Sequence, residues 1–338
     1  MVAAALFAGV VAYGILGGAD FGSGFFDATA GGSARGAELR TMVDHSIGPV
    51  WEANHVWLIY VLVMWWTGFP SSFAAATNTL FVPFLLALLG IVLRGAAFAF
   101  RKYADTLAQA RLFGAVFAGS SLLTPFFLGA IAGAIASGRV PLDGNGNLWS
   151  SWLTPTSLIG GVLAVGTCAF LAGVFLTADA QRSEHTALTE TLRRRTLAVG
   201  IATGIVVFAA LVPLQRDAAT LSQGLEGRAA PLVVLSGLAG LATLLLLVRR
   251  RYRPARLTAV VAVGAVLLGW GVGQYPWLLV DQETIQQAAG AEATLVALLV
   301  AVVLAVVLVL PPLAYLFWFV QASDRHQSKV DAAHVPHR

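Results

Sequence analysis

Long apolar segments separated by short polar segments run through almost the whole chain. If about 20 apolar residues make one crossing of a bilayer, the pattern predicts nine spans, at residues 2–27, 47–68, 74–99, 110–136, 154–178, 196–214, 230–248, 257–276 and 292–319. The first segment lacks a basic region and a convincing cleavage site, so we interpret it as a retained span. The pattern predicts an all-α polytopic membrane protein, with one integral membrane domain at 1–321 and a polar tail at 322–338 that we expect to be disordered.

The composition agrees with this class. Apolar residues make up 58% of the chain, charged residues 11%, and the mean hydropathy is +0.78, far from the averages of soluble domains. The net charge of +4 could suit a nucleic acid, but the arginines lie at the ends of apolar segments, where they orient a protein in the membrane. We therefore expect no nucleic-acid partner. Cys168, the one cysteine, can form neither an internal disulfide nor a Cys-based cluster.

Lys and Arg residues are distributed unequally between the two sides that nine spans create. The loops after spans 1, 3, 5 and 7 and the C-terminal tail hold 17 of the 21 basic residues, the opposite side holds 3, and Arg94 lies within a span. Basic residues accumulate on the cytoplasmic side of a membrane protein. We therefore predict an N-terminus outside the cell and a C-terminus in the cytoplasm.

Three charged residues lie inside predicted spans. At about 1.5 Å of rise per residue, Asp20, Glu52 and Arg94 each lie roughly 8–10 Å inside the cytoplasmic boundary. An ionisable side chain in hydrocarbon is costly and marks a functional site by default. Either acid could pair with Arg94, and a carboxyl left without a cation can exchange protons. Glu52 is our candidate for the unpaired acid.

Histidines that could bind a metal or haem are scarce within the spans. His55 follows Glu52 by three residues and so lies on the same helical face, where a hydrogen-bonded helix contact is commoner than a metal ligand. His45 lies at the edge of this span, and Met64 is the only methionine within a span beyond the initiator. These are too few for several haems with protein axial ligands, so we predict no metal or cofactor site on this chain.

Two stretches carry distinctive motifs, LGGADFGSGFF at residues 16–26 and IGPVWEANHVWLIY at residues 47–60. Together they resemble the paired signature of subunit II of the cytochrome bd quinol oxidases. The first is similar to the Gly-Phe-Asp-Leu-Gly-type motif of that family's first helix, and it matches at Asp20, Phe21 and Gly22. The second is similar to the more specific motif Pro-x-Trp-Asp/Glu-x-Asn-x-Val-Trp-Leu, and it matches at Trp51, Glu52, Asn54, Val56, Trp57 and Leu58. The chain departs from the family at Gly17, often acidic, at Ala19, usually aromatic, and at His55, often Gln or Glu.

The resemblance implies a fold and a complex. The nine helices would form two four-helix bundles and one peripheral helix. The chain would form a heterodimer, in the bacterial plasma membrane, with a subunit I that binds haems b558, b595 and d and the quinol. The complex would be an electrogenic menaquinol or ubiquinol oxidase of the aerobic respiratory chain that reduces O2 to water. A structural quinone or lipid and small single-helix accessory subunits are also compatible with this family.

The resemblance also implies roles for individual residues. Glu52 matches the acidic position at the cytoplasmic mouth of the family's proton pathway. We therefore expect a proton pathway through Glu52, His55 and Asp20. We expect structural pairing by Arg94, Asn54, Trp51 and Trp57. No catalytic residue is expected on this chain.

Two other functions remain open from the sequence. A secondary transporter places its sites near the midplane on interrupted helices, and Pro83 and Pro125 lie near the predicted midplane, although the charges lie toward the inner surface. A purely structural subunit would differ from the oxidase interpretation only at Glu52.

Two connections also carry expectations. The longest cytoplasmic loop is predicted at about 179–195, where Arg193–Arg195, together with Arg249–Arg251 at the end of span 7, would anchor lipid headgroups. The outer segment 277–291 is polar enough either to cap the bundle or to contact the partner.

Overall fold

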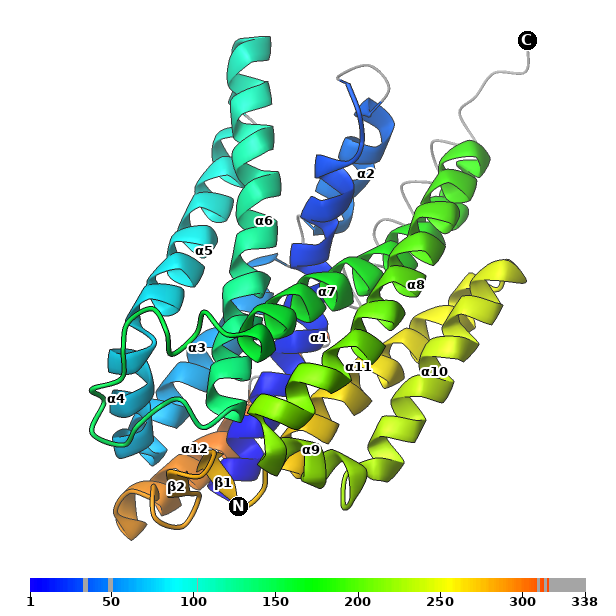
Figure 1. Cartoon of the computed structure of the whole chain (residues 1–338). Helices are drawn as coiled ribbons and strands as arrows, with labels where there is room; N and C mark the ends of the chain where they lie inside the picture. The colour runs from blue at the N-terminus through cyan, green and yellow to red at the C-terminus, as the bar shows by residue number, and fades with distance from the viewer. Residues whose placement is uncertain (33–35, 48–50, 102, 309–310, 313–314, 316–338) are drawn as a thin grey trace, which may run out of the picture.

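The computed structural model describes residues 1–32, 36–47, 51–101, 103–308, 311–312 and 315, and at residues 45, 47 and 51–53 it describes the backbone alone. Within these residues the chain is almost entirely helical, with one short hairpin (Figure 1). The elements are α1 (Val2–Ala28), α2 (Ala37–Ile47), α3 (Trp51–Gly68), α4 (Pro70–Thr79), α5 (Phe81–Arg101), α6 (Leu107–Ala136), α7 (Pro155–Arg182), α8 (Thr186–Asp217), α9 (Ala219–Glu226), α10 (Ala230–Val248), α11 (Tyr252–Gln274), β1 (Trp277–Leu279), β2 (Glu283–Thr284) and α12 (Glu292–Leu308).

The long helices form two groups that meet where α1 and α6 of the first group pack against α7 of the second. The first group contains α1, α3, α5 and α6, and the second contains α7, α8, α10 and α11. Helix α1 packs against α3 and α6 within its own group and against α7 across the boundary, while α12 packs against α1 and α3 at the edge. This arrangement confirms the predicted all-α polytopic fold.

Among the described residues, seven helices are long and apolar enough to cross a membrane, and α3 and α4 add an eighth if they count as one bent span. Helix α12 is a shorter apolar helix. Most of residues 309–319 and the predicted tail 322–338 lie outside the described residues, so the ninth span and the disordered tail stay predictions.

The third predicted span, 74–99, begins at the wrong place. Helix α4 turns by 116° away from the segment Asn54–Gly68. Phe69 has non-helical dihedral angles and Pro70 begins α4, because proline lacks the N–H that a continuing helix needs. The membrane-length helix α5 begins only at Phe81, so Pro83 lies in its first turn, where proline is tolerated. Pro83 is therefore not the midplane interruption that the transporter alternative assumed.

The predicted loop at 179–195 is also wrong. Helix α7 continues to Arg182 and α8 begins at Thr186, so residues 183–185 alone connect them. Glu184 has a φ of 59°, a left-handed conformation that ends a helix and reverses the chain. Residues 193–195 consequently lie on α8 rather than in a loop.

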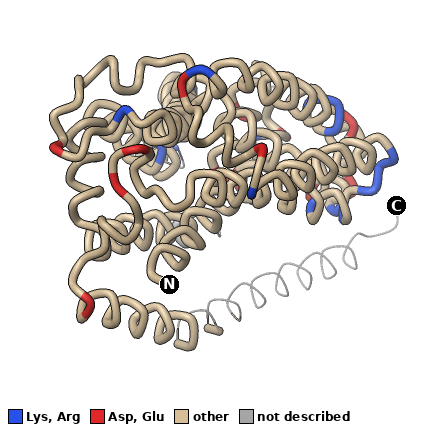
Figure 2. Tube along the Cα trace, turned by 60° about the horizontal axis from the view of Figure 1, so that its bottom comes forward, with Lys and Arg blue, Asp and Glu red and all other residues tan. Residues whose placement is uncertain are grey.

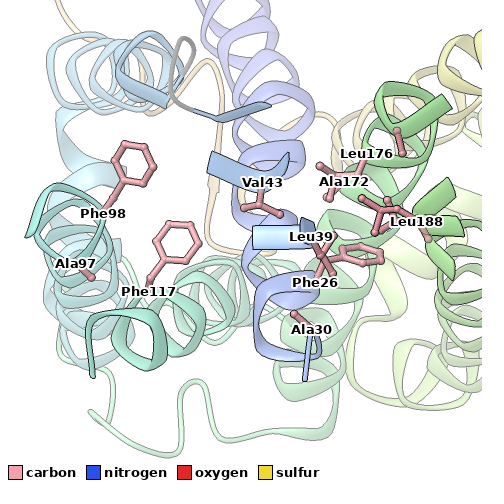
Figure 3. Packing of buried hydrophobic residues seen from close by; sticks show 12 residues of the cluster. Phe26, Ala30, Leu39, Val43, Ala97, Phe98, Phe117, Ala172, Leu176 and Leu188 are labelled. Carbon is pink, nitrogen blue, oxygen red and sulfur yellow. The ribbon is translucent and has the colours of Figure 1, made fainter. Parts of the chain in front are cut away.

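Helix α2 lies in a stretch that the hydropathy pattern left as a loop. Leu39 and Val43, spaced by one helical turn, are buried in a cluster with Phe26 of α1 and Ala172 of α7. Figure 3 shows these side chains from α1, α2 and α7 lying in one packed layer. The apolar i, i+4 pair therefore fastens α2 to the point where the two helix groups meet.

Small residues allow the central helices to approach closely. A Cβ atom at Gly22 of α1 would overlap the carbonyl oxygen of Cys168 on α7, and a Cβ atom at Gly90 of α5 would overlap the hydroxyl of Thr124 on α6. Membrane helices associate through such close packing because lipid tails provide no hydrophobic driving force between them.

The outer segment 277–291 packs back onto the helices. Leu279 of β1 is fully buried in a cluster with residues of α4 and α6. Glu283 of β2 is 5% exposed and accepts a 2.7 Å hydrogen bond from the Ser71 hydroxyl of α4. The segment therefore caps the bundle, which is one of the two roles left open by the sequence, and its contact with the partner stays a prediction.

Candidate functional site

A buried ion pair joins the first helix to α5. Arg94 is 2% exposed, and its Nη2 donates to Oδ1 of Asp20 at 2.8 Å while its Nη1 donates to Oδ2 at 3.1 Å. Nη2 also donates to the Asp20 carbonyl oxygen, and Nε donates to Oγ of Ser121 on α6 at 2.9 Å. Every nitrogen of the guanidinium therefore has a partner, as a buried charge requires.

Two aromatic rings enclose the guanidinium of Arg94. Its Cζ lies 4.9 Å from the ring centroid of Phe21 and 4.8 Å from that of Phe117, within the range of cation–π contacts. The ring of His55 on α3 lies 6.0 Å from the Phe21 ring at an interplanar angle of 62°. Phe21 therefore contacts both Arg94 and His55, and it brings the two sequence motifs together in space.

A second paired carboxylate lies two helical turns after Asp20 and was missed in the sequence. Asp27 has a side-chain exposure of 3% and accepts hydrogen bonds from Nε of Arg40 at 2.9 Å and from Nη1 of Arg101 at 2.6 Å. Arg101 also approaches Asp44 of α2 at 3.8 Å. The seven-residue spacing from Asp20, which places both acids on one face of α1, is the signal that could have revealed it.

This second cluster connects three elements at one end of the first helix group. Asp27 lies in the last turn of α1, Arg40 lies on α2, and Arg101 is the last residue of α5. Nη2 of Arg40 additionally donates to the carbonyl oxygen of Gly31 at 2.6 Å. These contacts fix the position of α2, which leads along the chain to α3 and to Glu52.

Tyr13 is a further polar residue that the sequence interpretation did not single out. It lies two turns before Asp20 on α1, and its ring lies edge-on to Phe21 with centroids 6.4 Å apart. Its hydroxyl is buried and has no hydrogen-bond partner among the described residues. A Cβ atom at Gly17 would lie 2.9 Å from the Tyr13 ring, so the glycine provides the space that the ring uses. The spacing of two helical turns between Tyr13 and Asp20 was the signal in the sequence that could have revealed this residue.

The remaining predicted residues lie on α3. Asn54 is 5% exposed, and the Trp57 ring lies 6.2 Å from that of Tyr60, whose hydroxyl donates to the carbonyl oxygen of Ala5 on α1. The side chains of Trp51 and Glu52 lie outside the described residues, as does that of His45. The structure therefore brings Asp20, Arg94 and His55 into one layer and leaves the contacts of Glu52 as a prediction.

The described residues contain no group of three or more His, Cys, Asp or Glu that could hold a metal ion. The layer around Asp20, Arg94 and His55 contains hydrogen-bonding groups from α1, α3, α5 and α6 inside an apolar bundle. Chemically, such a layer can fix helix positions and can border a path for protons.

The membrane-length helices and the paired intramembrane charges define a polytopic α-helical membrane protein with a buried polar layer in its first helix group. Residues 1–320 match the family of cytochrome bd terminal oxidase subunit II. The chain belongs to this family.

Curated relatives match over part of their length. The chain is 31% identical over 170 residues to the cytochrome bd ubiquinol oxidase subunit 2 of Bacillus subtilis, covering 49% of each chain. It is 28% identical over 166 residues to the cytochrome bd-I ubiquinol oxidase subunit 2 of Escherichia coli K12, covering 46% of this chain and 42% of the relative. The matched region thus spans about half the length of these relatives or less.

A solved structure shares the fold over nearly the full length. The chain superposes on one chain of the bd oxidase from Geobacillus thermodenitrificans with a TM-score of 0.76 at 24% identity, covering 94% of this chain and 96% of that chain. The arrangement of the helices is therefore that of a known bd oxidase chain.

Proposed function

We propose that this chain is subunit II of a quinol:O2 oxidoreductase of the aerobic respiratory chain in a bacterial plasma membrane. In this role it supports a haem-bearing subunit I and lines a cytoplasmic path for the protons consumed when O2 is reduced to water. Family membership supports the complex, since the relatives in Bacillus subtilis and Escherichia coli bear the name of ubiquinol oxidase subunits.

The observation that carries the proton path is the contact of Phe21 with both Arg94 and His55. It links the first motif to the second motif, in which Glu52 precedes His55 by one helical turn. A carboxyl at the start of a membrane helix can accept and release protons, and a histidine one turn deeper can relay them. We assign these two roles to Glu52 and His55.

Asp20 has a different role in this proposal. Both of its carboxylate oxygens accept from Arg94, and the Asp20 carbonyl oxygen does so as well. We therefore assign Asp20 and Arg94 to holding α1, α5 and α6 in register beside the path. Asn54, Trp51 and Trp57 keep the structural roles predicted from the second motif.

The proposed orientation follows from the basic residues. The side that carries the connections after α1, α5, α7 and α10 would face the cytoplasm, with the N-terminus outside. Glu52 then lies near the cytoplasmic end of α3, where protons enter. Haems b558, b595 and d would all be bound by subunit I, and this chain would provide no axial ligand.

The proposal is tested by purifying the tagged chain from its own membrane and recording a reduced-minus-oxidised spectrum. We expect a second polytopic subunit to co-purify with b- and d-type haem signals, and the preparation to consume O2 with a quinol. A chain that purifies alone and moves a solute into liposomes would overturn the oxidase assignment in favour of a transporter.

A further inference from the structure

A cavity of about 480 Å³ lies where α7 ends and α11 begins. Four arginines line it, Arg182, Arg250, Arg251 and Arg253, together with Gln181 and Tyr252, and none of its lining residues is acidic. Figure 2 shows several of the described arginines gathered at one end of the molecule. The size is that of small-ligand sites in proteins.

The arginines around this cavity differ in how far their charge is compensated. Glu190 of α8 accepts from Arg193 and Arg194 and lies 3.4 Å from Arg250. Asp179 of α7 pairs with Arg256 and lies 3.9 Å from Arg182.

Arg251 and Arg253 complete the set. Both are exposed, and neither has an ion pair with another described residue. The cavity therefore carries a surplus of positive charge.

Backbone geometry adds to this charge. The turn between α10 and α11 is tight, with Arg250 at a φ of 58°. It places Tyr252 and Arg253 in the first turn of the 23-residue helix α11. The N-terminal end of a helix has a partial positive charge that favours anions. Two independent features, the uncompensated arginines and the helix end, thus favour an anionic group in one cavity.

The surroundings of the cavity indicate where that anion comes from. Leu245 and Val248 at the end of α10 are 50% and 57% exposed, and Leu257 in the second turn of α11 is 68% exposed. Exposed aliphatic side chains on a membrane helix can pack against lipid acyl chains. The cavity thus lies directly at the boundary between an apolar helix surface and a basic rim.

We propose that this cavity binds the phosphate of an anionic phospholipid headgroup, with Arg251 and Arg253 as the principal ligands and the acyl chains along α10 and α11. A guanidinium binds phosphate oxygens through two parallel N–H groups, so arginine suits this task better than lysine. A soluble phosphate shares the chemistry of the headgroup, but the exposed aliphatic surface beside the cavity favours the lipid. The cavity lies in the second helix group, away from the Asp20–Arg94 layer.

The test is native mass spectrometry of the purified complex titrated with phosphatidylglycerol. Phosphatidylcholine of the same acyl chains and inorganic phosphate alone serve as separate probes. The variant R251Q/R253Q removes the two uncompensated charges. The matched control R111Q/R249Q removes two exposed arginines that do not line the cavity.

We expect the parent to bind phosphatidylglycerol in preference to phosphatidylcholine, and R251Q/R253Q to lose at least about tenfold in that affinity. R111Q/R249Q should stay within about twofold of the parent, because its charges act only through the general surface potential. Equal losses in the two variants would overturn the proposal in favour of nonspecific attraction. Phosphate binding that R251Q/R253Q abolishes, without any preference for phosphatidylglycerol, would replace the lipid by a soluble anion.

A measurement on the parent covers the case in which R251Q/R253Q does not assemble. Phenylglyoxal modifies accessible arginines, and peptide mapping identifies which ones react. Phosphatidylglycerol should protect Arg251 and Arg253 but not Arg249. Equal reactivity of the three with and without the lipid would contradict the site. Oxidase turnover is not a readout here, so the outcome is independent of the proposed function.

Discussion

Arg94 binds both carboxylate oxygens of Asp20, a residue 74 positions earlier in the chain, and the two side chains are 2% and 1% exposed. Through Ser121 the same guanidinium also reaches α6. Three helices of the first group are therefore joined at one buried charge. Loss of either partner leaves the other charge without compensation inside an apolar bundle.

Arg94→Leu should strongly reduce the amount of assembled complex. Removing one member of a buried pair costs about 3–5 kcal/mol, because the Asp20 carboxylate is left among apolar side chains. Asp20→Asn should be milder, since an amide oxygen can still accept from Arg94. Native gels of solubilised membranes measure both. Arg111→Leu, at an exposed arginine of α6, is the control, and full assembly of the Arg94 variant would contradict this account of the pair.

Asp27→Asn should loosen α2. The substitution leaves Arg40 and Arg101 facing a neutral group, and loss of a buried charged hydrogen-bond partner corresponds to at least about a tenfold change in local opening. Amide hydrogen exchange should therefore speed up in residues 37–47. Glu38→Gln is the control on the same helix. Glu38 is 55% exposed, and its ion pair with His185 is long, at 3.8 Å. Unchanged protection of α2 in the Asp27 variant would show that its apolar contacts alone hold it.

Gly22→Ala should destabilise the contact between α1 and α7. The added methyl group would overlap the carbonyl oxygen of Cys168, which is backbone and cannot rotate away. Overpacking of this kind costs about 1–3 kcal/mol. Gly119→Ala of α6 is the matched control, since its Cβ would meet nothing within 4 Å. A thermal-shift assay should show a lower melting temperature for Gly22→Ala alone, and equal melting temperatures would place α1 and α7 further apart than the structure does.

The chain expressed without its partner should contain no haem. Within the described residues His55 is the histidine that lies in the polar layer, and its ring packs against Phe21. In the assembled complex, His55→Ala should leave the haem content unchanged in a pyridine haemochrome assay. Stoichiometric haem on the isolated chain, lost on this substitution, would make His55 an axial ligand and the haem assignment wrong.

Apolar segment length was sufficient to predict the fold class and most helices. It could not predict where the third span begins, because residues 74–79 are apolar enough to be assigned to that span although they belong to α4, a separate helix that starts at Pro70. It also misplaced Arg193–Arg195, since hydropathy reports where a helix enters lipid and not where the helix begins. The apolar pair Leu39 and Val43 was too short a pattern to reveal α2.

The candidate site was predictable in part. Depth from segment boundaries placed Asp20 and Arg94 in one layer, which the structure shows as an ion pair. That Asp20 pairs with Arg94 depends on how α1 and α5 rotate about their axes, and sequence spacing within single helices does not specify that. Asp27 and Tyr13 were missed because both lie outside the motif at residues 16–26, although they share one face of α1 with Asp20.

The most direct test of the central claim compares Glu52→Gln, Glu52→Asp and the parent in fully assembled complex. Glutamine keeps the shape and hydrogen bonding of glutamate but cannot ionise, whereas aspartate keeps the acid. Quinol-dependent O2 consumption near neutral pH is measured per unit of haem, with Glu38→Gln as a control acid on the same side. We predict turnover at least several-fold lower for Glu52→Gln, with haem content intact, and turnover close to the parent for Glu52→Asp and Glu38→Gln. Equal turnover of Glu52→Gln and the parent would contradict the proton path and make Glu52 a structural residue.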